Sequence, residues 1–254
     1  MSEKVNPTAA VLLIGDEILS GRTKDKNLGY LADWLTALGI DLKEARLVAD
    51  DGPEIVAAVR ALAGRYTYVF STGGIGPTHD DITADCMAEA FGVEISHDGQ
   101  AVEILKAYYA AEPGKLNEAR LRMARIPHGA RLIANPVSGA PGFQIENVFV
   151  MAGVPKIMQG MLADIEPRLT QGAKMLSATV TANVGEGDIS KPLREIQAAY
   201  PDVVMGSYPF ERAGGYGTNL VLRSRDGARL EAAQADVAAM VARLTDSGGV
   251  KVKE

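Results

Sequence analysis

The sequence predicts an α/β protein whose mostly parallel sheet is covered by helices on both faces, followed by a second, small α/β domain. Two observations carry this prediction. From Thr8 onward, segments of strand character alternate with amphipathic helical segments, a pattern typical of parallel sheets joined by right-handed crossovers. After residue 174 a new βαββα pattern begins. We therefore expect two domains, residues 1–170 and 175–254, joined by a short linker.

Three strand–helix units make up the first part of the chain. The first strand is an unbroken apolar run, as expected when both faces of a strand are buried. Each following helix ends at a glycine, the residue that most often terminates helices. Ligands of such sheets lie beyond the carboxyl ends of the strands. The expected strands are Thr8–Ile14, Ile40–Val48 and Tyr66–Ser71, and the helices after them end at Gly39, Gly64 and Gly92.

The rest of the first domain begins with a charged, mostly helical excursion from His97 to Arg125. Short strands and a helix opened by a proline then complete the sheet. These elements are the strands Arg131–Ile133, Phe143–Ile145 and Val148–Met151 and the helix Pro155–Leu169. The second domain is expected to contain strand Ser177–Val184, helix Ile189–Tyr200, strands Val203–Tyr208 and Asn219–Arg223, and helix Arg229–Leu244. Gly214–Gly217 is expected to be a hairpin turn, and Ser247–Glu254 a frayed tail.

The composition excludes several classes of protein. Of 254 residues, 47% are hydrophobic and 23% charged, which is typical of a folded globular chain. The net charge of −6 repels phosphate backbones, so we expect no nucleic-acid partner. No apolar run approaches the roughly 18 residues needed to span a bilayer, so we expect no membrane association. A single cysteine, Cys86, forbids an internal disulfide and fits a cytoplasmic location.

The segment from Gly73 to Thr83 carries the densest functional signal. Its three glycines, Gly73, Gly74 and Gly76, let backbone N–H groups approach a ligand closely, and the helix that follows favours an anion at its N-terminus. Two adjacent carboxylates, Asp80 and Asp81, offer the hard oxygen ligands that Mg²⁺ prefers. The loop is therefore a candidate site for a metal ion and a phosphate group.

The same loop residues allow other interpretations. A dinucleotide fingerprint is excluded because its third glycine is missing, and a P-loop because no Lys-Ser/Thr pair follows. Structural capping stays open, because Asp80, Asp81 and Thr83 are all residues that cap helices. His79 is either a proton-transfer group or a surface histidine.

Four segments in order, Ile14–Leu19, Val48–Asp51, Gly73–Thr83 and Asn135–Phe143, resemble the amino-terminal region of competence/damage-inducible protein A. That region belongs to the MoaB/Mog molybdopterin-binding superfamily, which also includes a domain of eukaryotic FAD synthases. The resemblance covers about the first 170 residues, and the remainder resembles the small KH-like domain of the same proteins. The carboxy-terminal amidase domain of many relatives is not represented, so no deamidase activity is expected.

The resemblance implies a three-layer α/β/α domain whose pocket lies over the glycine-rich loop and holds a phosphate-bearing pterin or an adenine dinucleotide. It implies a divalent metal, Mg²⁺, Mn²⁺ or Co²⁺, and a homo-oligomer, either a dimer or a trimer. The resemblance implies that Asp81 is the acidic residue beside the metal and the phosphate. The carboxylates of Asp80 and Asp16 are expected to help, so the expected catalytic residues are Asp81 and Asp80 and the expected metal ligands are Asp81, Asp80 and Asp16. The ligand-binding residues that the resemblance implies are Gly73, Gly74, Gly76, Thr78, Asp16, Asp50, Asn135 and Gly142.

This sequence departs from the family pattern at three positions. The adenylyltransferase branch usually has Arg where this chain has Asp80, and a carboxylate there favours the hydrolase-like branch. Ala152 and Ile157 replace the Pro and Glu of that branch's Leu-Pro-Gly-Val-Pro-x-Glu-Met pattern. The leading hypothesis is a metal-dependent pyrophosphatase acting on an ADP-ribose-like substrate. The alternatives are a molybdopterin adenylyltransferase-type enzyme and a noncatalytic pterin- or nucleotide-binding module.

Outside the loop, the sequence predicts the roles of several single residues. Asp16 is favoured over its neighbour Glu17 as a site residue, because only one of two neighbours points into a site. Asn27 is expected to cap the helix that follows it. Cys86 is expected to be packed inside a helix. Three arginines of the excursion, Arg120, Arg122 and Arg125, are expected on a solvated face; the alternative is that the excursion folds over the pocket and brings them to the diphosphate.

Overall fold

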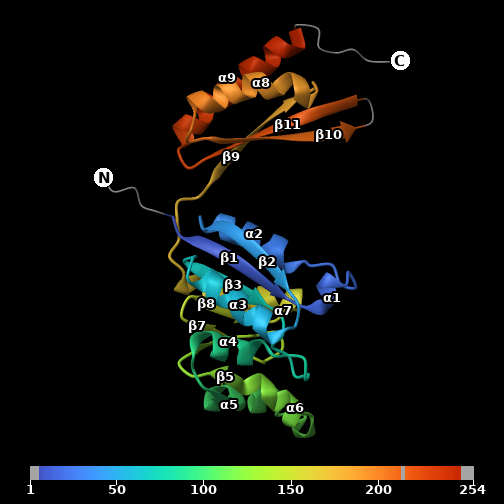
Figure 1. Ribbon diagram of the computed structural model, residues 1–254, viewed down its shortest axis with the longest axis vertical. Coiled ribbons are helices and arrows are strands. Elements are labelled where there is room, and N and C mark those ends of the chain that lie inside the picture. The colour runs from blue at the N-terminus through green and yellow to red at the C-terminus, as the bar shows by residue number, and fades with distance from the viewer. Residues whose placement is uncertain (1–5, 213–214, 247–254) are drawn as a thin grey trace. The chain divides into compact units, whose positions relative to one another are not determined.

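The computed structural model describes residues 6–212 and 215–246 (Figure 1). The chain divides into two compact units with their boundary between Gly172 and Ala173. Ser247–Glu254, expected to be a frayed tail, lies outside the described residues. No helix among residues 6–212 and 215–246 has the length and apolar character needed to cross a membrane.

The first unit is built on a six-stranded sheet whose order is β2-β1-β3-β8-β7-β6. The four strands β2, β1, β3 and β8 run parallel to one another. β7 is antiparallel to both of its neighbours, β8 and β6. The prediction of a mostly parallel sheet is therefore confirmed. The strands are β1 (Thr8–Ile14), β2 (Asp41–Val48), β3 (Tyr68–Thr72), β6 (Arg131–Ile133), β7 (Gly142–Ile145) and β8 (Val148–Met151).

Helices cover both faces of this sheet, so the predicted three-layer arrangement is confirmed. Side chains alternate along β1: Leu12 packs on one face and Leu13 on the other, and both are buried. This double burial explains the unbroken apolar run in the sequence. One face carries α3 (Gly52–Ala63), α4 (Thr83–Phe91) and α5 (Gly99–Tyr108), and the other carries α2 (Asn27–Ala37) and α7 (Pro155–Ile165).

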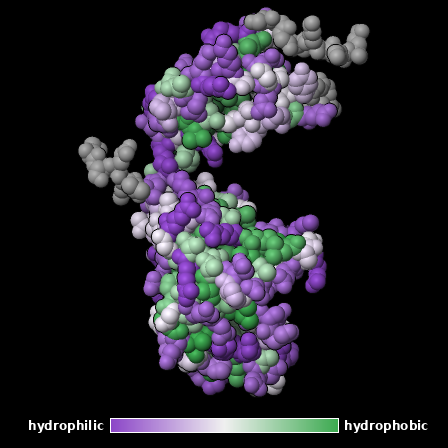
Figure 2. All heavy atoms as spheres, in the orientation of Figure 1, coloured by the Kyte–Doolittle hydropathy of each residue, from purple (hydrophilic) through white to green (hydrophobic). Residues whose placement is uncertain are grey.

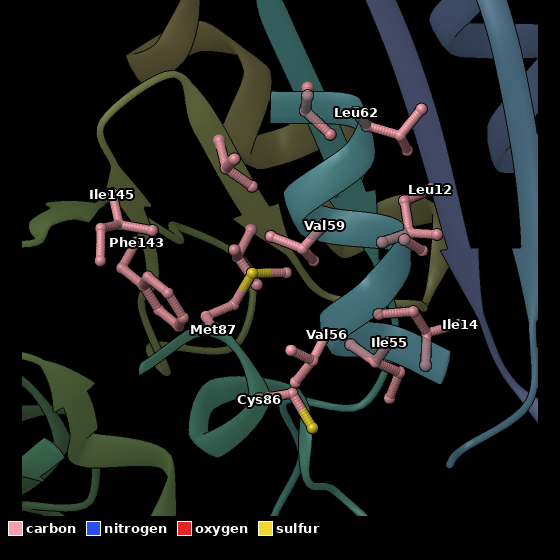
Figure 3. Close-up of a cluster of buried hydrophobic side chains, with 14 of the residues drawn as sticks. Leu12, Ile14, Ile55, Val56, Val59, Leu62, Cys86, Met87, Phe143 and Ile145 are labelled. Carbon is pink, nitrogen blue, oxygen red and sulfur yellow. The ribbon is translucent and has the colours of Figure 1, made fainter. Parts of the chain in front are cut away.

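The core on the α3 face fixes the helix that follows the glycine-rich loop (Figure 3). Met87 of α4 is fully buried in the same cluster as Val59 of α3 and Phe143 of β7. Burying a side chain of this size stabilises the fold by about 1.5–3 kcal/mol. α4 ends at Gly92 in the left-handed conformation, as predicted. The loop between β3 and α4 is therefore held at its far end by a packed helix.

The opposite core holds the two strands that flank the future site. The rings of Phe70 in β3 and Phe149 in β8 stack with centroids 5.3 Å apart, and Trp34 of α2 meets Phe70 edge-on at 5.7 Å. Aromatic pairs of this kind contribute about 0.5–1.5 kcal/mol beyond the area they bury. The loops that leave β3 and β8 therefore start from a rigid pair of strands.

The structure differs from the sequence prediction in its short elements. A one-turn helix, α1 (Asp16–Leu19), replaces the expected polar turn after β1. The excursion contains α6 (Glu118–Leu121) and 3₁₀ turns at Pro113–Lys115 and Arg122–Ala124, and it is flanked by two strands that pair antiparallel. These strands, β4 (Ile95–His97) and β5 (Arg125–Pro127), are three residues each, too short to show a periodic pattern.

The second unit has the predicted βαββα order. Its antiparallel sheet, ordered β10-β11-β9, packs its buried face against two helices. The elements are β9 (Leu176–Ala182), α8 (Glu186–Ala199), β10 (Val204–Arg212), β11 (Gly215–Ser224) and α9 (Gly227–Asp246). Gly215–Gly217, expected in a turn, lies in β11 because the strands pair along their whole length, and Gly214 lies outside the described residues.

The surfaces of the two units differ in the view of Figure 2. Hydrophilic side chains dominate the visible face of the second unit, whereas hydrophobic side chains gather on the first unit on the side where α1 lies. Leu19 of α1 is 54% exposed and Val154 is 56% exposed. Apolar side chains therefore reach solvent at the end of the first unit where the loops after β1 and β8 emerge.

Candidate functional site

A cavity of about 520 Å³ lies at the carboxyl ends of β1, β3 and β8. This is the edge of the sheet at which parallel α/β folds bind ligands. Its lining comes from the segments 14–17, 73–77, 80–81, 135–140 and 152–157, together with Thr23, Asp50 and Met123. The sequence prediction that the pocket lies over the glycine-rich loop agrees with this position.

The glycines of the loop are required by close packing. Gly73 has φ 109°, and a Cβ there would lie 2.1 Å from the carbonyl oxygen of Ile14. Gly74 has φ 65°, and its Cβ would lie 2.1 Å from the Thr83 hydroxyl. The N–H of Gly73 donates to the carbonyl of Met151 at 3.2 Å, so this amide is used by the sheet. Only glycine fits at these two positions.

The alternative interpretation, in which loop residues cap α4, is not supported by the structure. The N-cap of α4 is Ile82, and no side chain caps the helix. The buried hydroxyl of Thr83 donates instead to the carbonyl of Gly73 at 3.0 Å, and the N–H of Thr83 donates to the carbonyl of Gly74 at 3.0 Å. Thr83 therefore fixes the glycine bend, and the two aspartates are left for another role.

Asp81 faces the pocket and also closes its own loop. Its Oδ2 accepts hydrogen bonds from the Thr78 N–H at 2.8 Å and from the Thr78 hydroxyl at 2.5 Å. Its Oδ1 has no hydrogen bond within the described part of the chain. Thr78, predicted to bind the ligand, does not line the pocket. It positions Asp81 instead, and Oδ1 of Asp81 stays available to bind a ligand or a metal ion.

Three more carboxylates, those of Glu17, Asp50 and Asp80, line the cavity. Asp50 lines it and accepts the N–H of Asp16 at 2.9 Å. Burial raises the pKa of Asp50, and the nearby charges of Asp16, Glu17 and Asp80 raise it further. The polar surroundings of Asp80, first the Thr78 side chain and then the Asp80 backbone N–H, lower the pKa of its carboxyl.

Glu17, and not Asp16 as predicted, places its side chain in the pocket lining. The structure puts Glu17 in the pocket lining, whereas the Asp16 side chain is exposed and does not line it. The carboxylate of Glu17 folds back over Gly15, where a Cβ would lie 2.6 Å from its Oε2. Asp16 contributes its backbone N–H, which orients Asp50. One of the two neighbours does point away, but it is Asp16.

The residues proposed as metal ligands are spread along the pocket edge. Among the described residues, no three His, Cys, Asp or Glu side chains are gathered closely enough to hold a metal ion by themselves. Asp80 and Asp81 both line the cavity. Mg²⁺ is commonly bound by one or two carboxylates together with phosphate oxygens and water. Metal binding at this position therefore stays a prediction that requires the ligand's own oxygens.

Asn135 and Gly142 have mainly structural surroundings. Asn135 is 8% exposed, its amide donates to the Ser138 hydroxyl and the Ala140 carbonyl at 2.7 Å each, and its Oδ1 accepts the N–H groups of Val137 and Ser138. It lines the pocket but shapes the 135–140 loop. Gly142 does not line the pocket; its Cβ would lie 2.4 Å from the Val150 carbonyl.

Asn27 does not cap α2, so the prediction for this residue is wrong. The N-cap of α2 is Lys26, and Asp25 accepts the N–H groups at the start of the helix. Asn27 is 4% exposed, and its amide donates to the Gly153 carbonyl at 2.8 Å and to the Thr72 hydroxyl at 3.4 Å. It therefore joins the loops after β3 and β8. No local signal reveals this role, because the partners lie far away in sequence.

The excursion does fold onto the pocket. Met123, in the 3₁₀ turn after α6, lines the cavity together with Ile75. Val154, Pro155 and Ile157 add an apolar lining at the start of α7. The cavity thus combines carboxylates and backbone groups with apolar walls, as small-molecule sites usually do.

Comparison with known proteins identifies the two parts of the chain. Residues 10–171 match the family described as "Probable molybdopterin binding domain", and residues 174–245 match the middle domain of FAD synthase. The second match is not to an amidase domain. A crystal structure of the protein CinA from Thermoplasma acidophilum has 36% sequence identity and a TM-score of 0.59, covering 63% of this chain and 98% of that one.

Two relatives match different lengths of the chain. A CinA-like protein of Citrifermentans bemidjiense is 40% identical over 166 residues, which cover 63% of this chain and 40% of the relative. A "Probable FAD synthase" of Caenorhabditis elegans is 31% identical over 249 residues, which cover 89% of this chain and 48% of the relative. The chain thus spans less than half the length of either protein. It belongs to the molybdopterin-binding domain family and resembles, as predicted, the MoaB/Mog-like amino-terminal region of CinA proteins.

Proposed function

We propose that the cavity binds a phosphate-bearing nucleotide and that the protein hydrolyses its phosphoanhydride bond with the help of a divalent metal ion, with ADP-ribose-like molecules as the substrate class. One observation carries the proposal: the glycine bend, the carboxylates Asp80 and Asp81 and an apolar lining share one cavity of about 520 Å³. Sites for small ligands commonly enclose roughly 300–1,000 Å³.

The parts of the cavity suit the parts of such a ligand. Apolar side chains such as Val154 and Ile157 suit a flat heteroaromatic ring, and the free Oδ1 of Asp81 would hold a divalent metal ion. A divalent ion, when bound, neutralises phosphate charge and lowers the pKa of a coordinated water. Asp50, whose pKa is raised by burial, is suited to accept a proton from the attacking water.

The hydrolysis balances without a further reactant. The water oxygen bonds to one phosphorus, and the bond from that phosphorus to the bridging oxygen breaks. The bridging oxygen keeps the electron pair and leaves as part of the second phosphate group, and the water proton passes to the carboxylate. From ADP-ribose the products are AMP and ribose 5-phosphate.

A second candidate reaction is adenylyl transfer to a molybdopterin-type phosphate. The family description of residues 10–171 and the FAD synthase match over residues 174–245 favour it. Asp80 weighs against it, because a second carboxylate repels a triphosphate, whereas the arginine usual in that branch attracts it. Both reactions would use the same cavity, so they differ only in donor and acceptor.

The test compares both reactions in the same preparation. The purified protein is incubated with ADP-ribose and Mg²⁺, Mn²⁺ or Co²⁺, and separately with ATP and a phosphorylated pterin. Metal-dependent release of AMP from ADP-ribose is the expected result, lost in Asp81→Asn. ATP consumption that requires the pterin would establish the transferase instead. Binding measured by calorimetry with no turnover of either substrate would contradict both and leave a noncatalytic binding module.

We also propose that the protein is a homo-oligomer, as the family resemblance implies. Light scattering after size-exclusion chromatography gives the subunit number directly. A mass of one chain at micromolar concentration would contradict the proposal.

A further inference from the structure

The large cavity lacks a positively charged lining residue. Its side chains include the carboxylates of Glu17, Asp50, Asp80 and Asp81, and among the described residues that line it there is no Lys, Arg or His. A diphosphate carries several negative charges, and positively charged groups close to it are needed to bind it. One divalent ion compensates only part of this charge, so the proposed function needs a second cation.

A second, much smaller cavity of about 20 Å³ adjoins the first behind the glycine bend. Both cavities are lined by Gly74, Ile75, Gly76, Asp81 and Met123. The small cavity has room for about one water molecule. Unlike the large cavity, it is also lined by two arginines, Arg122 and Arg125.

The two arginines differ in what they already bind. Arg125 makes a two-pronged ion pair with Asp85, at 2.8 and 2.5 Å. The side chain of Arg122 has no hydrogen bond or ion pair within residues 6–212 and 215–246. Its Nε is buried and without a partner. An unpaired buried N–H of a charged group is costly, so a site that retains it commonly has a ligand to satisfy it.

We propose that Arg122 binds a phosphate oxygen of the ligand at the glycine bend, and that the substrate class is therefore a diphosphate. Asp81 would hold the divalent ion, which would neutralise part of the charge of the diphosphate, and the guanidinium of Arg122 would bind a phosphate oxygen. A planar guanidinium suits this role because its N–H groups match two phosphate oxygens. This inference rests on the proposed function for the identity of the cavity, but it concerns binding, which is measurable without turnover.

Arg120 provides a matched control on the same excursion. Its guanidinium donates to the Lys115 carbonyl and lies 5.3 Å from the centre of the Tyr109 ring. It lines neither the large nor the small cavity described here. A substitution at Arg120 changes the net charge by the same amount as one at Arg122 but should leave ligand binding unchanged.

The experiment is calorimetry with Mg²⁺ and two probes, ADP and inorganic pyrophosphate, on the full chain. Loss of charge-assisted hydrogen bonds predicts that Arg122→Gln weakens binding of both probes about 10- to 100-fold. Arg122→Lys should recover part of this loss, whereas Arg120→Gln should bind like the unmodified protein. Thermal unfolding of each variant shows whether a loss of binding follows from a loss of fold.

The outcomes separate this inference from the proposed function. If Arg122→Gln binds pyrophosphate as tightly as the unmodified protein, the role of Arg122 is refuted while hydrolysis of ADP-ribose can stand. If binding depends on Arg122 but no AMP is released from ADP-ribose, the hydrolase is refuted and the diphosphate site stands. An unmodified protein that binds neither probe would refute both.

Discussion

Thr78 donates two hydrogen bonds to a single oxygen of Asp81, one from its N–H at 2.8 Å and one from its hydroxyl at 2.5 Å. This pair closes the loop before α4 and turns the Asp81 carboxylate toward the cavity, which it lines. The same side chain thus has a structural contact through Oδ2 and a free Oδ1. The two roles can be separated by substitution.

Asp81→Asn keeps an oxygen that can accept from Thr78 but removes the charge needed for a metal ion. We expect its melting temperature to stay close to that of the unmodified protein while metal-dependent activity falls by about 100-fold or more, the scale of losing a charged group at a reacting phosphate. Asp81→Ala should also lose about 1 kcal/mol of stability with its two hydrogen bonds. Activity assays and thermal unfolding measure both effects. Equal activity in Asp81→Asn would contradict a metal at this residue.

Gly73→Ala is expected to destabilise the first unit strongly. The new Cβ would lie 2.1 Å from the backbone oxygen of Ile14, which cannot move without disturbing β1. Strain at φ 109° adds to this clash, and together they predict a loss of about 3 kcal/mol. The control is Gly29→Ala in α2, where a Cβ meets nothing within 4 Å and should stabilise the helix by up to about 1 kcal/mol. Urea unfolding that shows the same change for both would be inconsistent with this packing.

Asp50→Asn should change the pH dependence of stability. Burial raises the pKa of Asp50 in the folded state above its ordinary value, so its protonated form stabilises the fold below the unfolded-state pKa. That stability is lost as the pH rises through the raised, folded-state pKa. The asparagine variant lacks this loss and should be more stable than the unmodified protein at pH 7 by about 0.5 kcal/mol or less, with no difference near pH 3. Urea unfolding across this range is the measurement, and an equal gain at both pH values would argue against ionisation as the cause.

Cys86 is expected to be unreactive in the folded protein. It is 5% exposed in α4, and burial, with the nearby Asp85 charge, raises the pKa of its thiol to about 11. At pH 8 almost none of it is thiolate, the reactive form. A disulfide reagent such as Ellman's should therefore react slowly until denaturant is added, and then at the rate of a free thiol. Rapid reaction of the native protein would show that α4 opens readily.

Much of the fold follows from patterns that are local in the sequence. The unbroken apolar run of β1 and the glycines that end the helices, such as Gly92, are each sufficient to place an element. β4 and β5 could not be predicted from local patterns, because each is three residues long and is defined by its pairing with the other. α1 is a single turn, and without it the orientation of Asp16 and Glu17 could not be predicted.

The candidate site was predictable only in part for a related reason. The glycine-rich loop and its aspartates form a continuous segment, so composition and spacing reveal them. Asn27 and Arg122 depend on residues distant in sequence: Asn27 contacts Gly153, and Arg122 reaches a cavity shared with Gly74. An arginine on a charged helical stretch looks like a solvated side chain until the excursion is seen folded onto the pocket.

The neighbours of β3 in the sheet have a consequence for how the chain is made. β3 pairs with β1, which precedes it, and with β8, which follows only after the whole excursion and the β6–β7 hairpin. During synthesis, one edge of β3 therefore waits, with unpaired backbone groups, until residue 148 has left the ribosome. An exposed, apolar strand edge is a template for aggregation. Newly made chains should thus depend on chaperones most in the interval before β8 arrives.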